Sequence, residues 1–253
     1  MRMLFALALW WAALGLHAQQ QELRLQAGYL SGTWSDGAYA PFDYHLGGAL
    51  ARGAYQYESE KGLRVLLRAQ TELGQLSRKG QPHLGSSFAA LQAGIALQSV
   101  LWQSGGASFS AGPSFQIRGQ QVAWEEDEGY SSAWTYQNTF QAGLLAFAGW
   151  QAGHWSAGAE ASWPFAGRVG RPGYRPGGSP DNGKGLLFNF DEAQWLGPNG
   201  FRAPEAAFQL SYTFSNGLSP GIAYRWAYTR TSNGISASKQ QLGSVLLGVT
   251  LKL

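Results

Sequence analysis

Hydrophobic and polar residues alternate one by one along most of the chain. In residues 133–150 every second position except Asn138 is apolar, with aromatic side chains at both ends and mostly small or aliphatic ones between them. The opposite face carries Thr, Gln and Gly from Thr135 to Gly143. A period of two is the signature of a β-strand with two different faces. The same pattern recurs in residues 22–30, 63–72, 154–165, 206–214, 221–230 and 244–253, and further strands are expected near 44–57, 86–101 and 107–121.

The connections between these ten segments alternate in length. The second, fourth, sixth and eighth are short, whereas the others are longer and the seventh, from Gly167 to Ala203, is the longest. Short turns at one rim and long loops at the other are typical of transmembrane β-barrels, in which the turns are periplasmic and the loops extracellular. We therefore predict an all-β fold, a transmembrane antiparallel up-and-down barrel of about ten strands, with eight as the alternative. A secreted β-sandwich or propeller would bury similar faces, but the aromatic ends of the strands favour lipid.

In one strand the pattern is irregular. Arg52 falls on the same face as Leu46 and Leu50, and we expect a β-bulge in residues 44–57 to separate the charge from the leucines.

The two ends of the sequence carry export signals. Arg2, the apolar run from Met3 to Leu16 and the small residue Ala18 predict a signal peptide over residues 1–18, which leaves 19–253 as the barrel. The run is shorter than the roughly 20 residues of a spanning helix. The last segment alternates up to the apolar Leu253, like the C-terminal signal of bacterial outer-membrane proteins, which usually ends in Phe. We expect the partners to be outer-membrane lipid, lipopolysaccharide and the barrel assembly machinery.

Composition excludes several classes of site. The chain has no Cys, so disulfides and thiolate metal sites are excluded, and no cofactor or metal site is predicted. The 18 Lys and Arg nearly balance the 15 Asp and Glu, which argues against nucleic-acid binding. The abundance of Trp, Tyr, Phe and Gly with few charges fits a membrane barrel.

Charged residues gather on the face of the strands that should line the lumen. In a barrel of ten strands the lumen is narrow, so we expect these charges to pair into a plug, with a narrow anion-favouring pore as the alternative. The predicted lumen charge network consists of Glu22, Arg24, Arg64, Arg68, Glu72, Arg118, Glu160, Arg225 and Lys252.

Two further groups could carry chemistry. His154, Ser156 and Glu160 share one side of a strand, but a carboxylate six residues from the imidazole lies roughly 20 Å away, too far to orient it. No catalytic residues are therefore predicted. The four acidic residues 125–128 form an outer loop, solvated or bridged by divalent cations to lipopolysaccharide phosphates.

The long extracellular loop, at about 168–202, is rich in Gly and Pro. Loops of this length are functional or disordered. The apolar stretch Leu186–Phe190 could fold inward as a constriction or cap. Any contact with a ligand or partner is expected from its charged residues, Arg168, Arg171, Arg175, Lys184, Asp191 and Glu192.

The C-terminal stretch Tyr224–Leu253 distantly resembles the last hairpin of lipid A 3-O-deacylase-type barrels. That family carries His-x-Ser-Asn and, a dozen residues past the Ser, a Glu near the start of the last strand. Ser232 and Asn233 match the Ser-Asn pair, but Arg230 stands at the His position and Ser244 at the Glu position. The resemblance implies shared barrel ancestry, since a nucleophile without its base is inactive. Omptin proteases are also ten-stranded barrels, but the chain shows no counterpart of their His and Asp pairs, with only His83 in an expected loop.

Three functions remain open from the sequence. The favoured one is a non-enzymatic surface protein that acts through its extracellular loops. The alternatives are a small passive pore and an outer-membrane hydrolase that modifies lipid A.

Overall fold

The computed structural model describes residues 18–36, 40–78, 81–124, 133–170, 193–232 and 237–253. These residues form strands, turns and short irregular segments, without helices. No helix in this part of the chain has the length and hydropathy needed to cross a membrane. The signal peptide predicted over 1–18 lies outside the described residues except for Ala18.

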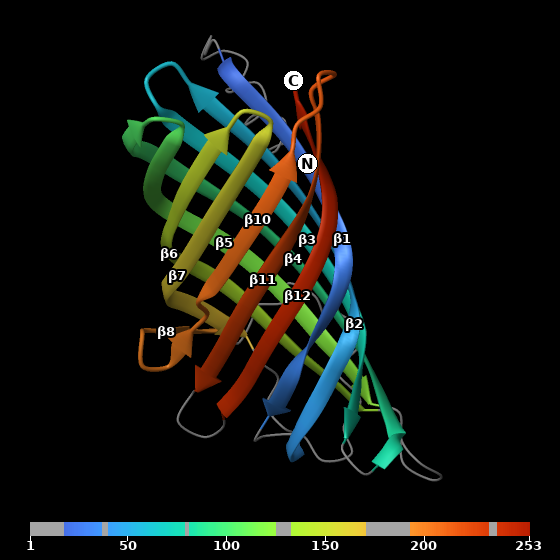
Figure 1. Ribbon diagram of the computed structural model, residues 1–253. Helices are drawn as coiled ribbons and strands as arrows, with labels where there is room; N and C mark the ends of the chain where they lie inside the picture. Colours follow the sequence, from blue (N-terminus) through green and yellow to red (C-terminus); the bar gives the residue numbers. More distant parts are fainter. Residues whose placement is uncertain (1–17, 37–39, 79–80, 125–132, 171–192, 233–236) are drawn as a thin grey trace, which may run out of the picture.

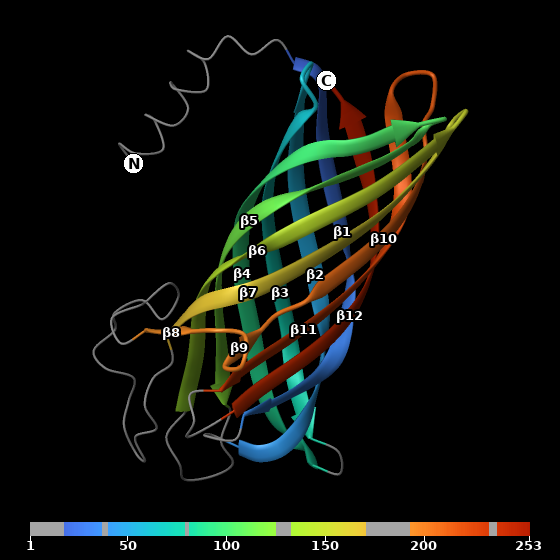
Figure 2. The same cartoon turned by 90° about the vertical axis from the view of Figure 1, so that its left-hand side faces the viewer.

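The strands form one closed antiparallel wall (Figures 1 and 2). Each long strand pairs with the next along the chain, β12 pairs with β1, and β10 pairs with β7, so that ten long strands complete a ring. This confirms the predicted barrel of ten strands rather than eight. The strands are β1 (Ala18–Asp36), β2 (Ala40–Ser59), β3 (Leu63–Arg78), β4 (Gln81–Ser104), β5 (Ala107–Trp124), β6 (Ala133–Ala152), β7 (Trp155–Gly170), β8 (Gln194–Leu196), β9 (Phe201–Arg202), β10 (Glu205–Tyr212), β11 (Leu218–Ser232) and β12 (Ala237–Lys252).

Short strands complete the wall beside β10, which has only eight residues. β8 pairs with β7, where Trp195 lies opposite Arg168, and β9 pairs with β11, where Arg202 lies opposite Arg230. Both stand in the space that β10 leaves between its neighbours (Figure 2). Part of the expected long loop, residues 194–202, therefore belongs to the barrel wall, and β7 continues through Gly170.

The two rims of the barrel differ. β1 begins and β12 ends at one rim, where Glu22 pairs with Lys252, and we call this rim the terminal end. The connections at the terminal end are the short turns around Gly62, Gly105–Gly106, Gly153 and Gly217, whose glycines all have positive φ. The opposite rim is called the loop end.

Several strands are longer than the sequence pattern predicts at the loop end. β1 and β2 are separated only by residues 37–39, and β3 and β4 only by 79–80, so the expected long loops there are wrong. His83 lies in β4 rather than in a loop. The outward side chains of these extensions include Thr33, His45, Gln75 and Gln241, which are exposed and polar. The neighbouring inward residues are mostly apolar, so here the alternation is inverted and the apolar face is the lumen face.

The outer surface nearer the terminal end is apolar. Its exposed side chains include Leu25 on β1, Trp163 on β7, Ile222 on β11 and Leu247 on β12, the last of which is 67% exposed. A soluble protein would bury such a continuous apolar surface, whereas lipid solvates it. Aromatic residues near the terminal end, such as Trp150 and Trp155, lie where an interfacial belt is expected.

The lengths of the strands show that the wall is taller than the bilayer. β4 has 24 residues. At about 3.3 Å per residue and a tilt of about 40°, such a strand rises roughly 60 Å, compared with an apolar band of about 25 Å. The loop end of the barrel therefore projects well beyond the membrane.

Candidate functional site: the barrel lumen

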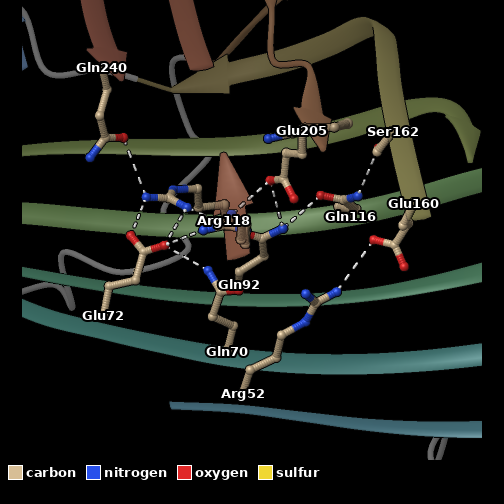
Figure 3. A network of polar contacts seen from close by, with 12 residues as sticks. Arg52, Gln70, Glu72, Gln92, Gln116, Arg118, Glu160, Ser162, Glu205 and Gln240 are labelled. Carbon is tan, nitrogen blue, oxygen red and sulfur yellow. Dashed lines mark hydrogen bonds and ion pairs between the residues drawn. The ribbon is translucent and has the colours of Figure 1, made fainter. Parts of the chain in front are cut away.

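The lumen of the barrel holds a buried polar network (Figure 3). We call it the central network and define it by seven charged residues and four glutamines. Three of the glutamines bind charged side chains, and Gln116 accepts a hydrogen bond from Gln92. The charged residues are Arg52, Arg68, Glu72, Arg118, Glu160, Glu205 and Arg225, and the glutamines are Gln70, Gln92, Gln116 and Gln240.

Glu72 on β3 is the most buried carboxylate of this network, with a side chain only 1% exposed. Arg118 donates two hydrogen bonds to this carboxylate, of 2.6 Å and 3.4 Å, from two guanidinium nitrogens. Arg225 donates to the same carboxylate at 3.3 Å. The amide of Gln70 donates to it at 2.6 Å. Such a fork of charge-assisted hydrogen bonds compensates for part of the desolvation cost of a buried carboxylate.

Two further glutamates complete the ion pairs. Glu160 on β7 accepts from Arg52 at 3.5 Å and also from Arg68. Glu205 on β10 accepts from Arg225 at 3.1 Å. Arg225 thus joins Glu72 and Glu205 although its own side chain is only 2% exposed.

The ion pairs connect opposite walls. β2, which carries Arg52, and β7, which carries Glu160, are five strands apart in either direction around the ring. Arg68 and Glu72 on β3 reach strands four positions away, β7 and β11. Side chains therefore bridge the lumen at this level, as expected where paired charges fill a narrow barrel.

Apolar side chains fill much of the lumen beside the network. Leu50 is the cross-strand partner of Glu72, so the two kinds of packing meet directly. The cluster comprises Leu30, Trp34, Tyr44, Leu46, Leu50, Leu76, Phe88, Ala90, Val122, Ala223, Leu242 and Leu246. Most of these residues lie closer to the loop end, where a smaller cluster forms around the fully buried Phe201 of β9.

The bulge expected in residues 44–57 of β2 is absent from its pairing, so that prediction is wrong. The pairing of β2 with both neighbours is continuous through Leu46, Leu50 and Arg52, so no bulge separates them. All three side chains point into the lumen. Arg52 and the two leucines share one face because the lumen is polar at the level of Arg52 and apolar further toward the loop end.

The terminal end of the lumen remains open. A polar cavity of about 570 Å³ lies there, lined among others by Glu22, Arg64, Ser156 and Lys252. We call this cavity at the terminal end the cup. A small cavity of about 20 Å³, enough for about one water molecule, lies within the central network. From the central network toward the loop end the lumen is packed.

No protein-family model matches the sequence, and no curated protein matches it. Among solved structures, the outer membrane protease OmpT from Escherichia coli is similar over 94% of this chain and 98% of its own, at 10% identity and a TM-score of 0.64. The chain has the fold of a bacterial outer-membrane β-barrel. The closed wall and apolar exterior place it in the outer membrane. Because the short turns of such barrels are periplasmic, we expect the terminal end to face the periplasm and the loop end to face outward.

Two other outer-membrane barrels show more distant similarity. The translocator domain of the autotransporter NalP from Neisseria meningitidis has 11% identity and a TM-score of 0.47, with 99% of this chain and 95% of that chain covered. Neisserial surface protein A has 12% identity and a TM-score of 0.40, with 91% and 97% covered. At these identities the likeness concerns the fold alone.

The structure divides the predicted lumen charges of this outer-membrane barrel into two groups. Arg68, Glu72, Arg118, Glu160 and Arg225 meet in the central network. The other four lie in the periplasmic cup. There Glu22 and Arg24 are 3.8 Å apart, Arg64 binds Glu58 at 2.7 Å, and Lys252 lines the wall.

Three participants were missed in the sequence. Arg52 was recognised on its strand but not included in the network, Glu58 was assigned to a turn, and Glu205 stands one residue before the expected start of its strand. Arg52 already lies within the strand expected near 44–57. When the alternation of inward and outward positions is extended by one residue in β2 and in β10, Glu58 and Glu205 also fall on the lumen face.

The remaining candidate residues do not form a second site in the described part of this outer-membrane barrel. Arg168 is exposed on β7, and the other loop residues, 171–192, lie outside the described residues, as does the acidic segment 125–128. Within the described residues no group of three or more His, Asp or Glu could hold a metal ion.

The residues of the two hydrolase hypotheses have other partners. His154 is in a turn, with Nδ1 3.0 Å from the carbonyl of Thr213, Ser156 bonds Ser211 at 2.7 Å, and Glu160 is held by arginines. The positions that resemble lipid A 3-O-deacylases are also separated. Ser232 pairs with Ala237, so Ser244 is about 23 Å further along β12 at roughly 3.3 Å per residue. Asn233 lies outside the described residues.

Proposed function

We propose that this protein is a plugged outer-membrane barrel that acts through its outer end rather than as a diffusion pore. The observation that carries the proposal is the set of ion pairs between opposite walls, Arg52 with Glu160 and Glu72 with Arg225. A solute crossing the lumen would have to separate these pairs and expose buried charges, which is costly in a low-dielectric interior.

The height of the wall supports a role at the surface. The outer end projects beyond the membrane, and its outward side chains are polar. Connecting segments on a rigid scaffold are the usual sites of binding, and residues 125–132, 171–192 and 233–236 join the strands at this end. The passive pore and the lipid A hydrolase are not favoured by a specific observation in the described residues.

Conductance tests the plug. In planar bilayers the purified full-length protein is expected to give no discrete current steps, because ion pairs between opposite walls cross the lumen at the central network. A general porin reconstituted in the same bilayers serves as the positive control. Regular, reproducible steps from the wild-type protein, scaling with its concentration, would show that the lumen conducts and that the proposal is wrong.

Lipopolysaccharide is the proposed partner of the outer end. Replacing Arg168, Arg171, Arg175 and Lys184 together with Gln is expected to weaken lipopolysaccharide binding at least tenfold, since four charge contacts with phosphates, of about 0.5 kcal/mol each, amount to about 2 kcal/mol. Binding is measured with purified protein immobilised in detergent. Lys61→Gln, at an exposed periplasmic turn, is the control. An unchanged affinity in the fourfold variant would rule out this loop as the contact.

A further inference from the structure

The periplasmic cup has two chemically different walls. Its charged residues, Glu22, Arg24, Glu58, Arg64 and Lys252, all belong to the adjacent strands β12, β1, β2 and β3. The facing wall offers neutral hydroxyl and amide groups, among them Ser108 on β5, Ser156 on β7 and Gln209 on β10. Solvation of the barrel mouth does not require that charged and neutral groups lie on opposite walls. A ligand with one charged and one neutral side would match this arrangement.

The cup also contains hydrogen-bonding groups that the described part of the chain does not use. Arg24 is 3.8 Å from Glu22 and makes no hydrogen bond there, and Lys252 forms no ion pair with a described residue. The amides of Gln56 and Gln209 likewise lack a hydrogen-bond partner among those residues. By contrast, the glutamines of the central network, such as Gln92, are bound to neighbouring side chains.

The charges of the cup leave a surplus of positive charge. Glu58 is already held by Arg64, through two hydrogen bonds of 2.7 Å and 3.1 Å, and Arg64 also donates to Ser110 at 3.0 Å. Glu22 then remains opposite both Arg24 and Lys252. Glu22, Arg24 and Lys252 together therefore carry one net positive charge, which favours an anionic ligand at the mouth of the cup.

The size of the cup and its apolar surface narrow the class of ligand. A volume of about 570 Å³ is within the range of small-molecule sites. Phe147 contributes an aromatic ring to the wall, with the guanidinium of Arg64 5.4 Å from the ring centre. A sugar ring presents both hydroxyl groups and an apolar face, and a sugar acid adds a carboxylate.

We propose that the periplasmic cup binds a small carboxylate-bearing saccharide. Arg24 and Lys252 bind the carboxylate, and the amides of Gln56 and Gln209 bind hydroxyl groups. The central network crosses the lumen beyond the cup, so the ligand binds from the periplasm and is not conducted. This site is separate from the surface role proposed above.

Titration calorimetry of the purified full-length protein in detergent tests this proposal. Digalacturonate is expected to bind saturably at one site, and neutral cellobiose at least tenfold more weakly. The double variant Arg24→Gln/Lys252→Gln is expected to lose at least tenfold in affinity for digalacturonate. Lys239→Gln, a substitution of an exposed lysine at the other end of β12, is the matched control and should bind as the wild type does.

Each other outcome contradicts the proposal. No saturable heat with digalacturonate, equal affinity for cellobiose, or an unchanged double variant would remove the carboxylate site. Tighter binding of an acidic dipeptide such as Asp-Asp would show that the cup recognises peptides instead. The single variant Lys252→Gln, next to the C-terminal residue, keeps the test decisive if the double variant does not fold.

Discussion

Replacing Glu72 with Gln is expected to lower the free energy of unfolding by about 3–5 kcal/mol, the usual cost of removing one partner from a buried ion pair. The substitution is nearly isosteric, but it leaves Arg118 and Arg225 without their shared carboxylate. Both side chains are almost completely buried, at 7% and 2% exposed, so water cannot easily take its place.

Unfolding in urea, followed by Trp fluorescence in lipid vesicles, measures this loss. Glu60→Gln, at an exposed turn, is the control and should change stability by less than about 0.5 kcal/mol. Removing charge from both sides, with Glu72→Gln and Arg118→Gln together, is expected to cost less than the sum of the single variants. A loss below about 1 kcal/mol for Glu72→Gln alone would mean that the lumen is hydrated at this level.

A charge on the outer face of β12 is expected to have the next largest effect. Leu247→Arg should lower the stability in vesicles by about 2–4 kcal/mol, because the arginine would face the hydrocarbon of the bilayer. Leu247 is 67% exposed and lies between the outward residues Val245 and Val249.

Gln241→Arg is the matched control for this substitution. Gln241 points outward from the same strand but lies closer to the outer rim, where the wall projects from the membrane. Its substitution should change stability by less than about 0.5 kcal/mol. Equal effects of Leu247→Arg and Gln241→Arg on stability in vesicles would place both positions in the same environment and would contradict the assignment of the apolar band to lipid.

The membrane-embedded part of the fold could be predicted from the sequence because each strand there separates lipid from lumen. Leu247 and Leu25 face outward, and the period of two records this directly. The projecting part of the fold could not be predicted in the same way, since its outer face contacts water rather than lipid. Residues such as Thr33 and Gln75 then look like loop residues, although their backbone continues the sheet.

The site was only partly predictable for a related reason. Alternation assigns a side chain to the lumen but does not give its height there, because neighbouring strands are staggered around a barrel. Glu160 and Lys252 were therefore grouped together, although one belongs to the central network and the other to the cup. The leucines beside Arg52 were misleading because part of the lumen is packed like an ordinary protein core.

The backbone pairing of the barrel wall is weakest at the outer end of the short strand β10. Beyond Glu205, among the described residues, three residue pairs link β8 to β7 and two link β9 to β11, besides the backbone hydrogen bonds from Tyr228 to Pro204 and from Ser232 to Gly200. By contrast, β1 and β12 are paired along almost their whole length. Local opening costs least where the fewest backbone hydrogen bonds must break. The outer half of the wall is therefore expected to open most readily between β7 and β11. The packing of Phe201 against its apolar neighbours opposes this opening.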